Sequence, residues 1–262
     1  MRANFLLTCA ILIITPQISM AQQKEIDTVQ NFTVKVPEQK RFYAGNGLDF
    51  MMLSTAIVSK PGKTAHITMP RFTAAVNIGF TFSYDLSTRF GVFSGIGLRN
   101  MGFIEKVGDS TIKRRVYSLG VPLGVKIGNL RNRNFVFFGG GIDVPFHYKE
   151  KSFRERGDKD RINEWFSDRT QRIMPFMFAG LSFDPGVTLK LQYYPGNFLN
   201  PDYEERAKGT YTGLPPIIKP YAGYSVHLLL LSLGIDIHYN QYKIQEREYQ
   251  EMKEERQKVN LM

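Results

Sequence analysis

The sequence predicts an all-β fold, an eight-stranded antiparallel up-and-down transmembrane β-barrel with a short C-terminal helical tail. Three observations predict it. Apolar residues recur at every second position in segment after segment, the connections between these segments are alternately short and long, and the face opposite the apolar one consists of Gly, Ser, Ala and Thr. Successive side chains of a strand point to opposite faces, so each segment has one apolar face and one small, polar face.

Residues 1–21 have the layout of a secretory signal peptide. A basic residue precedes an apolar run from Phe5 to Ile14, and small residues follow, which predicts cleavage near Ala21. The run is too short to span a bilayer, so we expect the mature protein to lie beyond the inner membrane. The single cysteine, Cys9, falls inside this segment, so we expect the mature chain to have no disulfide and no thiolate metal site.

The mature chain divides into three parts. Residues 22–40 are polar and irregular, which indicates a periplasmic lead-in, and residues 41–242 hold the alternating segments of the barrel. Residues 243–262 carry closely spaced acidic and basic side chains, which predicts a charged periplasmic tail in the form of a solvated helix. No stretch after the signal segment reaches the roughly 18 apolar residues that a membrane helix requires, so we expect strands to make the crossing.

Eight segments with a period of two are expected to form the barrel wall. They cover residues 42–58, 69–86, 89–103, 117–128, 134–148, 172–183, 186–194 and 226–239. The fourth is the most regular, since the alternation holds from Tyr117 to Gly128. Pro122 stands in its middle and cannot donate a ladder hydrogen bond, so we expect a bulge or a missing bond at that residue.

The connections sort by length. Residues 85–88, 129–133 and 184–186 are tight turns, whereas residues 59–68, 106–111, 149–171 and 195–219 form longer connections. Short turns at one end and long loops at the other are typical of transmembrane barrels, with the short turns in the periplasm. A soluble barrel has no reason to sort its loops in this way.

The small residues indicate which face meets lipid. A solvated sheet face rich in glycine would be a poor strand, because Gly costs about 0.5–1 kcal/mol relative to Ala. The inside of an eight-stranded barrel, in contrast, is only just wide enough for side chains to fill it. We therefore expect the small face to line a narrow lumen and the apolar face to meet lipid.

Two stretches resemble a known family. DLSTRFGVFSGIGLRNMGF is a tight turn followed by a glycine-spaced strand, and VYSLGVPLGVKIG is the strand after it. Together with SMAQQ at the end of the signal segment, they are similar to the small outer-membrane β-barrel domain of Bacteroidota described as PorT-like. The resemblance covers residues 41–242 and implies an accessory role in secretion or transport machinery. The last strand is also similar to the terminal signal of such barrels, carried here by Ser232, Gly234, Ile237 and Tyr239.

Scattered charges fall on the face that we assign to the lumen. They are Asp49, Arg99, Lys126, Asp143, Lys190, Asp236 and His238. A buried charge without a partner is very costly, so we expect these groups to pair along the lumen and to plug it. Asp143 and Asp236 are the candidate partners of Lys126. The alternative is a narrow porin-like channel that conducts ions or small solutes.

The chain offers little for catalysis. Ser225 and His227 lie two apart on one face at the start of the last strand, which would suit a lipid-A-modifying enzyme with His227 as base, but no third, orienting acid is evident. No two histidines have metal-ligand spacing, and no glycine-rich phosphate loop precedes a helix. We therefore expect a protein without enzymatic activity, without a metal and without a cofactor.

The outer segment 149–172 mixes both charges densely and holds the only tryptophan. Its candidate docking residues are Arg161, Trp165, Phe166 and Arg169, with the two aromatic residues as the apolar anchor for lipopolysaccharide phosphates or for a partner protein. The net charge of +10 favours contact with anionic headgroups. Basic residues are interspersed with acidic ones, so nothing favours nucleic-acid binding.

These observations predict a non-enzymatic protein of the bacterial outer membrane, either a structural barrel or an accessory subunit of a secretion or transport assembly. The expected partners are outer-membrane lipid, lipopolysaccharide and a larger outer-membrane protein complex. The narrow channel and the lipid-A-modifying enzyme stay open as alternatives.

Overall fold

A computed structural model describes residues 41–154, 159–207 and 213–238, together with Glu251 and Glu254. The chain divides into Met1–Gln39 and Lys40–Met262, and the barrel belongs to the second unit. The predicted signal segment, the lead-in 22–40 and the predicted tail 243–262 apart from those two glutamates lie outside the described residues. Within the described residues, no helix is long and apolar enough to cross a membrane.

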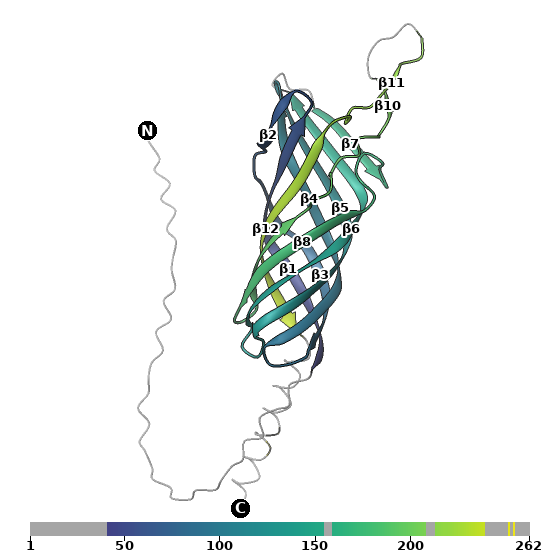
Figure 1. Cartoon of the computed structure of the whole chain (residues 1–262). Coiled ribbons are helices and arrows are strands. Elements are labelled where there is room, and N and C mark those ends of the chain that lie inside the picture. The colour runs from purple at the N-terminus through teal and green to yellow at the C-terminus, as the bar shows by residue number, and fades with distance from the viewer. Residues whose placement is uncertain (1–40, 155–158, 208–212, 239–250, 252–253, 255–262) are drawn as a thin grey trace, which may run out of the picture. The chain divides into compact units, whose positions relative to one another are not determined.

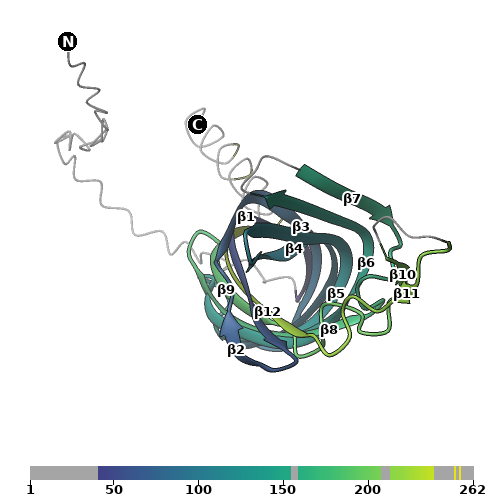
Figure 2. The same ribbon diagram turned by 90° about the horizontal axis from the view of Figure 1, so that it is seen from above.

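In the described part of the chain, eight antiparallel strands close into a ring. Their bounds are β1 Phe42–Lys60, β3 Arg71–Asp85, β4 Phe90–Val107, β5 Ser110–Asn129, β6 Asn134–Arg154, β8 Met174–Phe183, β9 Val187–Tyr193 and β12 Ser225–His238. Each of the eight pairs with the next one along the chain, and β12 pairs with β1 to close the ring. Figures 1 and 2 show the ring from the side and from above. The predicted eight-stranded up-and-down barrel is confirmed.

The described residues also hold four short strands outside the ring, in segments predicted as loops. β2 (Lys63–Ile67) pairs with the end of β1, and β7 (Lys159–Trp165) pairs with the end of β6. β10 (Glu205–Arg206) and β11 (Ile217–Ile218) form a small hairpin. All four lie at the upper end in Figure 1, and Figure 2 shows β7 outside the ring. We call this the outer end of the barrel, and the opposite one the turn end.

Two of the predicted long connections are shorter than expected, because the strands are longer. β4 and β5 continue until only Gly108 and Asp109 connect them, and β6 with β7 occupies much of the predicted loop 149–171. A transmembrane strand needs about 9–11 residues, whereas β5 has 20 and β6 has 21. These strands extend beyond the membrane, where polar outward side chains replace the apolar ones on which the prediction relied.

A bulge at Phe146 reverses the facing of β6. Across β5, Ser118 pairs with Pro145 and Tyr117 with His147, so Phe146 is an extra residue. On the turn side of the bulge the odd-numbered residues of β6 point inward, and on the outer side the even-numbered ones do. A proline cannot donate to the ladder and is therefore common at bulges. The bulge accompanies the proline of β6, whereas we expected one at the proline of β5.

The prediction for Pro122 is correct for the missing bond and wrong for the bulge. β5 and β6 pair without a break through Pro122 and Gly141. On the other side, Ser94 pairs with Leu123, but no residue of β4 pairs with Pro122. The Ser94 hydroxyl donates to the Pro122 carbonyl oxygen at 2.9 Å, so the backbone groups of this proline point toward β4. The hydrogen-bond ladder is therefore interrupted between β5 and β4, the side on which the missing N–H of Pro122 would have donated.

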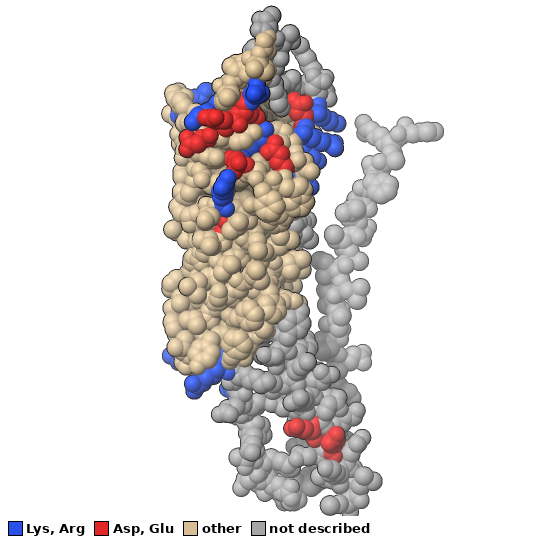
Figure 3. Space-filling view, turned by 90° about the vertical axis from the view of Figure 1, so that its right-hand side faces the viewer, with Lys and Arg blue, Asp and Glu red and all other residues tan. Residues whose placement is uncertain are grey.

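The outward face of the wall is apolar. We call its exposed outward side chains the apolar belt, and they are Leu48, Leu53, Phe72, Ile78, Phe80, Phe82, Ile96, Leu98, Leu119, Val121, Leu123, Val136, Phe138, Ile142, Val144, Met177, Leu181, Leu189, Leu191, Leu231, Ile235 and Ile237. On the face seen in Figure 3, a broad uncharged band lies between charged residues at the two ends. Such a band is the surface expected of a barrel in lipid, and the predicted outward direction of the apolar face is confirmed.

The glycine face makes room for large side chains from neighbouring strands. A Cβ on Gly120 would overlap the carboxylate of Asp143, and a Cβ on Gly124 would lie 2.7 Å from the ring of Phe93. One on Gly180 would collide with the ring of Phe137. These residues are small because the lumen in front of them is already filled.

Candidate functional site

One ion pair joins β4 to β6 on the lumen side of β5, the strand between them. Nη1 of Arg99 lies 2.8 Å from Oδ1 of Asp143. The other carboxylate oxygen accepts a hydrogen bond from the Tyr194 hydroxyl, which itself accepts one from the Gln192 amide at 2.5 Å. The guanidinium also lies over the Phe176 ring, 4.3 Å from its centroid. Asp143 is completely buried, and both of its oxygens are bonded, so partners replace the water that would otherwise stabilise its charge.

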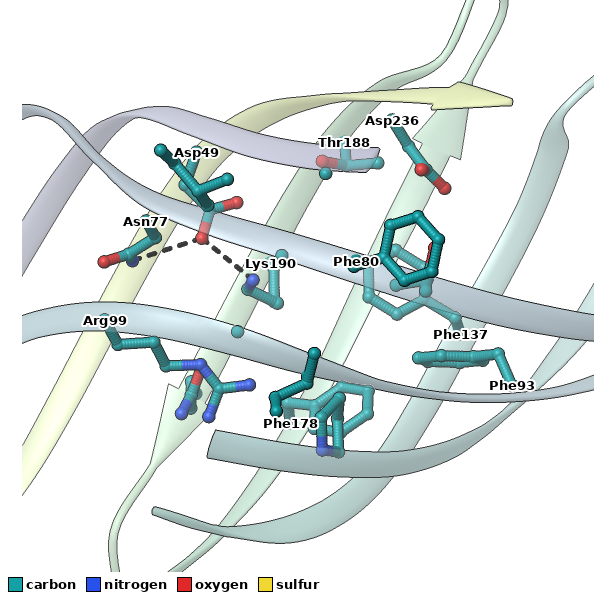
Figure 4. Close-up of a pocket in the computed structure, with 18 of the residues that line it drawn as sticks. Asp49, Asn77, Phe80, Phe93, Arg99, Phe137, Phe178, Thr188, Lys190 and Asp236 are labelled. Atoms are coloured by element: carbon teal, nitrogen blue, oxygen red, sulfur yellow. Dashed lines mark hydrogen bonds and ion pairs between the residues drawn. The ribbon is translucent and has the colours of Figure 1, made fainter. Parts of the chain in front are cut away.

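A second ion pair joins β9 to β1. Nζ of Lys190 lies 2.9 Å from Oδ2 of Asp49, and the same oxygen accepts a hydrogen bond from the Asn77 amide at 3.2 Å. Figure 4 shows these three side chains near Arg99. β1 shifts its register between Asp49 and Met51, and shifts of this kind re-aim the neighbouring side chains.

Lys126 is surrounded by hydroxyls and rings. Its ammonium donates to Oγ of Ser83 at 2.7 Å and to the Tyr43 hydroxyl at 3.5 Å. The rings of Tyr43, Phe93 and Phe135 have their centroids 5.3, 5.2 and 5.4 Å from the ammonium nitrogen. These distances are within the range of cation–π attraction, which is stronger where water is excluded.

Of the two predicted partners of Lys126, Asp143 is wrong, whereas Asp236 lies close enough to attract the charge of Lys126. Asp143 is bonded to Arg99, so it is not the partner of Lys126. Asp236 lines the same cavity as Lys126, and its backbone carbonyl accepts a hydrogen bond from Arg133 at 3.0 Å. Alternation shows which face a residue occupies, but its position along the barrel axis depends on strand tilt and stagger. The remaining predicted lumen residue, His238, is the last residue of β12.

A cavity of about 130 Å³ lies between the ion pairs and a cluster of rings. Its lining includes the polar residues Asp49, Asn77, Arg99 and Lys190 and the rings of Phe93, Phe137 and Phe178, and Asp236 lies apart from the other polar groups (Figure 4). Gly47, Gly79 and Gly97 pair side by side on β1, β3 and β4, and a Cβ on any of them would meet no atom closer than 3.5 Å. This row of glycines leaves the space open, and the cavity has room for several water molecules.

A second charge network, which was not predicted from the sequence, lies at the outer end. Glu105 binds Lys60 at 2.5 Å and Arg114 at 2.8 Å, and Arg114 also binds Glu150 at 3.0 Å. Glu105 and Arg114 are buried. Both continue the inward positions of β4 and β5, which is the signal that could have identified them. The predicted strands 89–103 and 117–128 stop short of both residues, so neither residue was assigned to a strand.

Arg169, a predicted docking residue, is buried among partners. Its Nε lies 3.1 Å from Glu164, its Nη2 lies 2.7 Å from Glu205, and its Nη1 donates to the Tyr221 hydroxyl at 3.3 Å. The Tyr203 ring centroid lies 4.6 Å from the guanidinium. Burial disfavours the charge, but the hydrogen bond to Tyr221 and the two carboxylates outweigh burial and raise the pKa of Arg169 above its ordinary value. This side chain ties β7 to the β10 hairpin and is not available for docking.

The other predicted docking residues are exposed on β7 or directly after it. Trp165 is 64% exposed and Phe166 is 77% exposed, and Arg161 is exposed on β7. The Trp165 indole stacks on His147 with a centroid distance of 4.2 Å, and His147 stacks on Tyr117 at 5.6 Å. The three rings form one row across β7, β6 and β5. We call this row the ring row.

The candidate catalytic pair is formed, without an orienting acid. Oγ of Ser225 lies 2.8 Å from Nε2 of His227. The other ring nitrogen, Nδ1, is buried without a hydrogen-bond partner in the described part of the chain. A histidine base is normally oriented by a third group at that nitrogen. Among the described residues, no three His, Cys, Asp or Glu side chains come together in a group that could hold a metal ion.

Comparisons with known proteins give distant structural likenesses. No family model matches the chain, and no curated protein sequence matches it. The attachment invasion locus protein Ail of Yersinia pestis, in complex with the heparin analogue sucrose octasulfate, is 14% identical with a TM-score of 0.35, over 75% of this chain and 99% of that chain. Neisserial surface protein A is 14% identical with a TM-score of 0.33, over 75% of this chain and 96% of that chain. The outer membrane protease OmpT of Escherichia coli is 7% identical with a TM-score of 0.23, over 76% and 97%. Likenesses at these TM-scores carry no argument about function.

Proposed function

We propose that this chain is an integral protein of the bacterial outer membrane without enzymatic activity, whose barrel is closed by its own side chains. It serves as a structural barrel or as an accessory subunit of a secretion or transport assembly. The apolar belt supports the membrane location, because a closed barrel with an apolar outer surface satisfies its backbone in lipid. The resemblance of residues 41–242 to PorT-like barrels of Bacteroidota is the reason for proposing the accessory role.

The filling of the lumen carries this proposal. In the wall, the ion pairs of Arg99 and Lys190 lie inside the barrel, where each joins strands two apart. Next to them the rings of Phe93, Phe137 and Phe178 pack with centroid distances of 5.9 to 6.2 Å. A barrel of eight strands has an interior that side chains fill, unlike the water-filled interior of larger porins.

The outer end of the lumen is filled from the loop that follows β9. Phe198 and Leu199 are buried there, and the backbone N–H of Phe198 donates to the carbonyl of Val226 on β12 at 2.8 Å. The Phe198 ring packs edge-on against Phe103 of β4 with a centroid distance of 5.5 Å. The long connection thus contributes side chains to the interior, which favours a plugged barrel over a channel.

Single-channel recording in planar bilayers tests the closed lumen. The purified barrel should give no steady current. Phe137→Ala removes a ring from the lumen, and Phe138→Ala removes one from the lipid-facing position beside it. Only the first should increase transient leak currents. Steady currents from the unmodified protein would contradict the closed lumen and favour the narrow porin-like channel.

Purification in mild detergent tests the accessory role. A subunit of an assembly should co-purify with a partner in stoichiometric amounts and release it in a harsh detergent that leaves the barrel folded. A barrel that is isolated alone at native expression levels contradicts the accessory role and leaves the structural one.

The distance of 2.8 Å between Ser225 and His227 favours a second candidate function, a lipid-A-modifying enzyme. The serine oxygen would attack an acyl ester while His227 takes its proton. The ester C–O bond would then break as His227 gives that proton to the departing sugar hydroxyl, which leaves the acyl group on Ser225. Expression should then alter the mass of lipid A, and both Ser225→Ala and His227→Ala should abolish the change, whereas Ser59→Ala on the adjacent strand should not. An unchanged lipid A mass excludes this function.

A further inference from the structure

The outer parts of β5, β6 and β7 carry basic side chains in rows on their outward face. Lys113, Lys151 and Arg161 pair side by side across the three strands, and Arg115 pairs with Lys149 two residues closer to the apolar belt. Lys159 occupies the same face of β7. The alternate positions hold buried, inward-pointing residues such as Arg114, Val116 and Tyr148. We call these six basic residues the basic face.

The acidic residues of the same strands occupy the opposite face. Glu150 binds Arg114 and Glu164 binds Arg169, both on the inward side. Within the described residues, no side chain of the basic face has an ion-pair partner. Like charges directly opposite on neighbouring strands are destabilising, and strands lie only about 4.8 Å apart. The rows therefore cost stability unless an anion with several charges lies on them.

The order of residues along β5 indicates which anion this is. On its outward face, Leu123, Val121 and Leu119 of the apolar belt are followed by Tyr117 of the ring row and then by Arg115 and Lys113. A membrane lipid has the same order, with acyl chains, a boundary region where aromatic rings are favoured, and a charged headgroup.

The ring row and the basic face are in direct contact. Arg115 and Lys149 lie 5.9 and 5.5 Å from the centroid of the Tyr117 ring, so two cations flank the ring at the boundary. The indole of Trp165 closes the same row on β7. A phosphate group at the boundary would meet cations from two strands, with three more basic side chains in the next row.

We propose that the basic face binds the phosphate groups of outer-leaflet lipids whose acyl chains lie on the apolar belt. The continuity of belt, ring row and basic face on single strands favours a lipid over a soluble polyanion, because a soluble ligand would need the cations but not the apolar and aromatic residues below them. The inference depends on the proposed outer-membrane location and is independent of the closed lumen.

The fluorescence of Trp165, the only tryptophan of the chain, tests the proposal directly. The full chain in neutral detergent micelles is titrated with bisphosphorylated lipid A, with fully dephosphorylated lipid A and with hexametaphosphate as a soluble polyanion. Bisphosphorylated lipid A should change the Trp165 emission saturably, and the dephosphorylated form should not. A response to the dephosphorylated form of equal size, or tighter binding of hexametaphosphate than of lipid A, would overturn the proposal.

Matched triple variants assign the effect to the basic face. Lys113→Gln/Lys151→Gln/Arg161→Gln removes the outer row, and Lys63→Gln/Arg89→Gln/Arg131→Gln removes the same charge from exposed positions elsewhere. The first should weaken lipid A binding on the order of 100-fold, at about 1 kcal/mol for each cation near an anionic surface. The second should change it by less than about threefold, since distant exposed charges are screened by salt. Equal weakening in both variants would mean that net charge alone attracts the lipid, and would refute the site.

Two controls keep the result decisive. Heat-modifiable migration on gels shows whether each variant is folded, and the single variant Lys151→Gln, in the centre of the row, replaces the triple variant if that one does not fold. Insertion of the unmodified chain into phosphatidylcholine vesicles tests the membrane location itself. A chain that inserts but does not distinguish the two forms of lipid A refutes the lipid site and leaves the outer-membrane location intact.

Discussion

β5 and β6 are built in opposite ways at their two ends. Toward the turn end, their outward side chains are apolar and their inward ones are small or polar, as the outward Leu119 and Leu123 and the inward Gly120 and Lys126 illustrate on β5. Toward the outer end, basic and aromatic side chains point outward, and the interior holds an apolar core with the buried ion pair of Glu105 and Arg114.

The difference follows from what surrounds each part. The wall has lipid outside and a narrow lumen inside, so apolar groups go out and small groups go in. The outer part has water outside and is filled by the loop after β9, so it follows the ordinary rule of an apolar interior and a charged surface. The bulge at Phe146 lies where β6 passes from one arrangement to the other. The same backbone hydrogen-bond ladder thus continues from the part surrounded by lipid into the part surrounded by water, and only the side chains differ between the two parts.

Deletion of Phe146 should disrupt the difference between the two ends of β6 more than any other change. Without the extra residue, the outer part of β6 would turn over, so that Lys149 and Lys151 point into the core and Tyr148 points into water. We expect loss of the heat-modifiable folded form on gels. A folded barrel with unchanged Trp165 fluorescence would show that the bulge does not control the facing of β6. Phe146→Ala keeps the residue count and should fold.

Gly120→Ala should be the most damaging small substitution in the wall. The new Cβ would overlap Oδ1 of Asp143 and lie 2.7 Å from Nη1 of Arg99, which breaks a buried ion pair at a cost of about 3–5 kcal/mol. Gly47→Ala is the matched control, because a Cβ there has nothing within 4 Å, and it should change stability by less than about 1 kcal/mol. Urea unfolding from lipid vesicles measures both, and equal costs would refute the filled lumen at Gly120.

Leu123→Arg tests whether lipid or water surrounds the apolar belt. Leu123 is 67% exposed in the apolar belt, and an arginine facing the middle of a bilayer costs about 2–4 kcal/mol. Thr64→Arg places the same charge on the exposed strand β2 at the outer end and should cost less than about 0.5 kcal/mol. The comparison is made by reversible unfolding in vesicles. A tolerated arginine at residue 123 would mean that the belt does not face lipid there.

Ser94→Ala should lower the free energy of unfolding less than the other changes do. It removes the hydroxyl that donates to the Pro122 carbonyl at 2.9 Å beside the gap in the ladder, at a cost of about 0.5–1.5 kcal/mol. Ser94→Thr keeps a hydroxyl and should retain more of the stability than Ser94→Ala does. Identical unfolding midpoints for the three proteins would show that this bond contributes nothing to closing the gap.

The alternation of apolar and small residues was enough to predict the number of wall strands and the face of each that meets lipid. Both depend on a period of two along one segment, which is a local property that the barrel does not change. The same period placed Asp49, Arg99, Asp143 and Lys190 on the inward face, where they lie in the barrel. The resemblance to a family, the signal segment and the tail stay predictions.

Which inward groups meet, and where the strands end, depends on the tertiary structure. The partner of Asp143 is Arg99 and not Lys126, because strand tilt and stagger set the position of each residue along the axis. The strand β7 and the burial of Arg169 depend on contacts between segments that are separate in the chain, and no local pattern in residues 149–171 reports them. The rows of the basic face emerged for the same reason, since cross-strand pairing brought together cations that the sequence keeps on three separate strands.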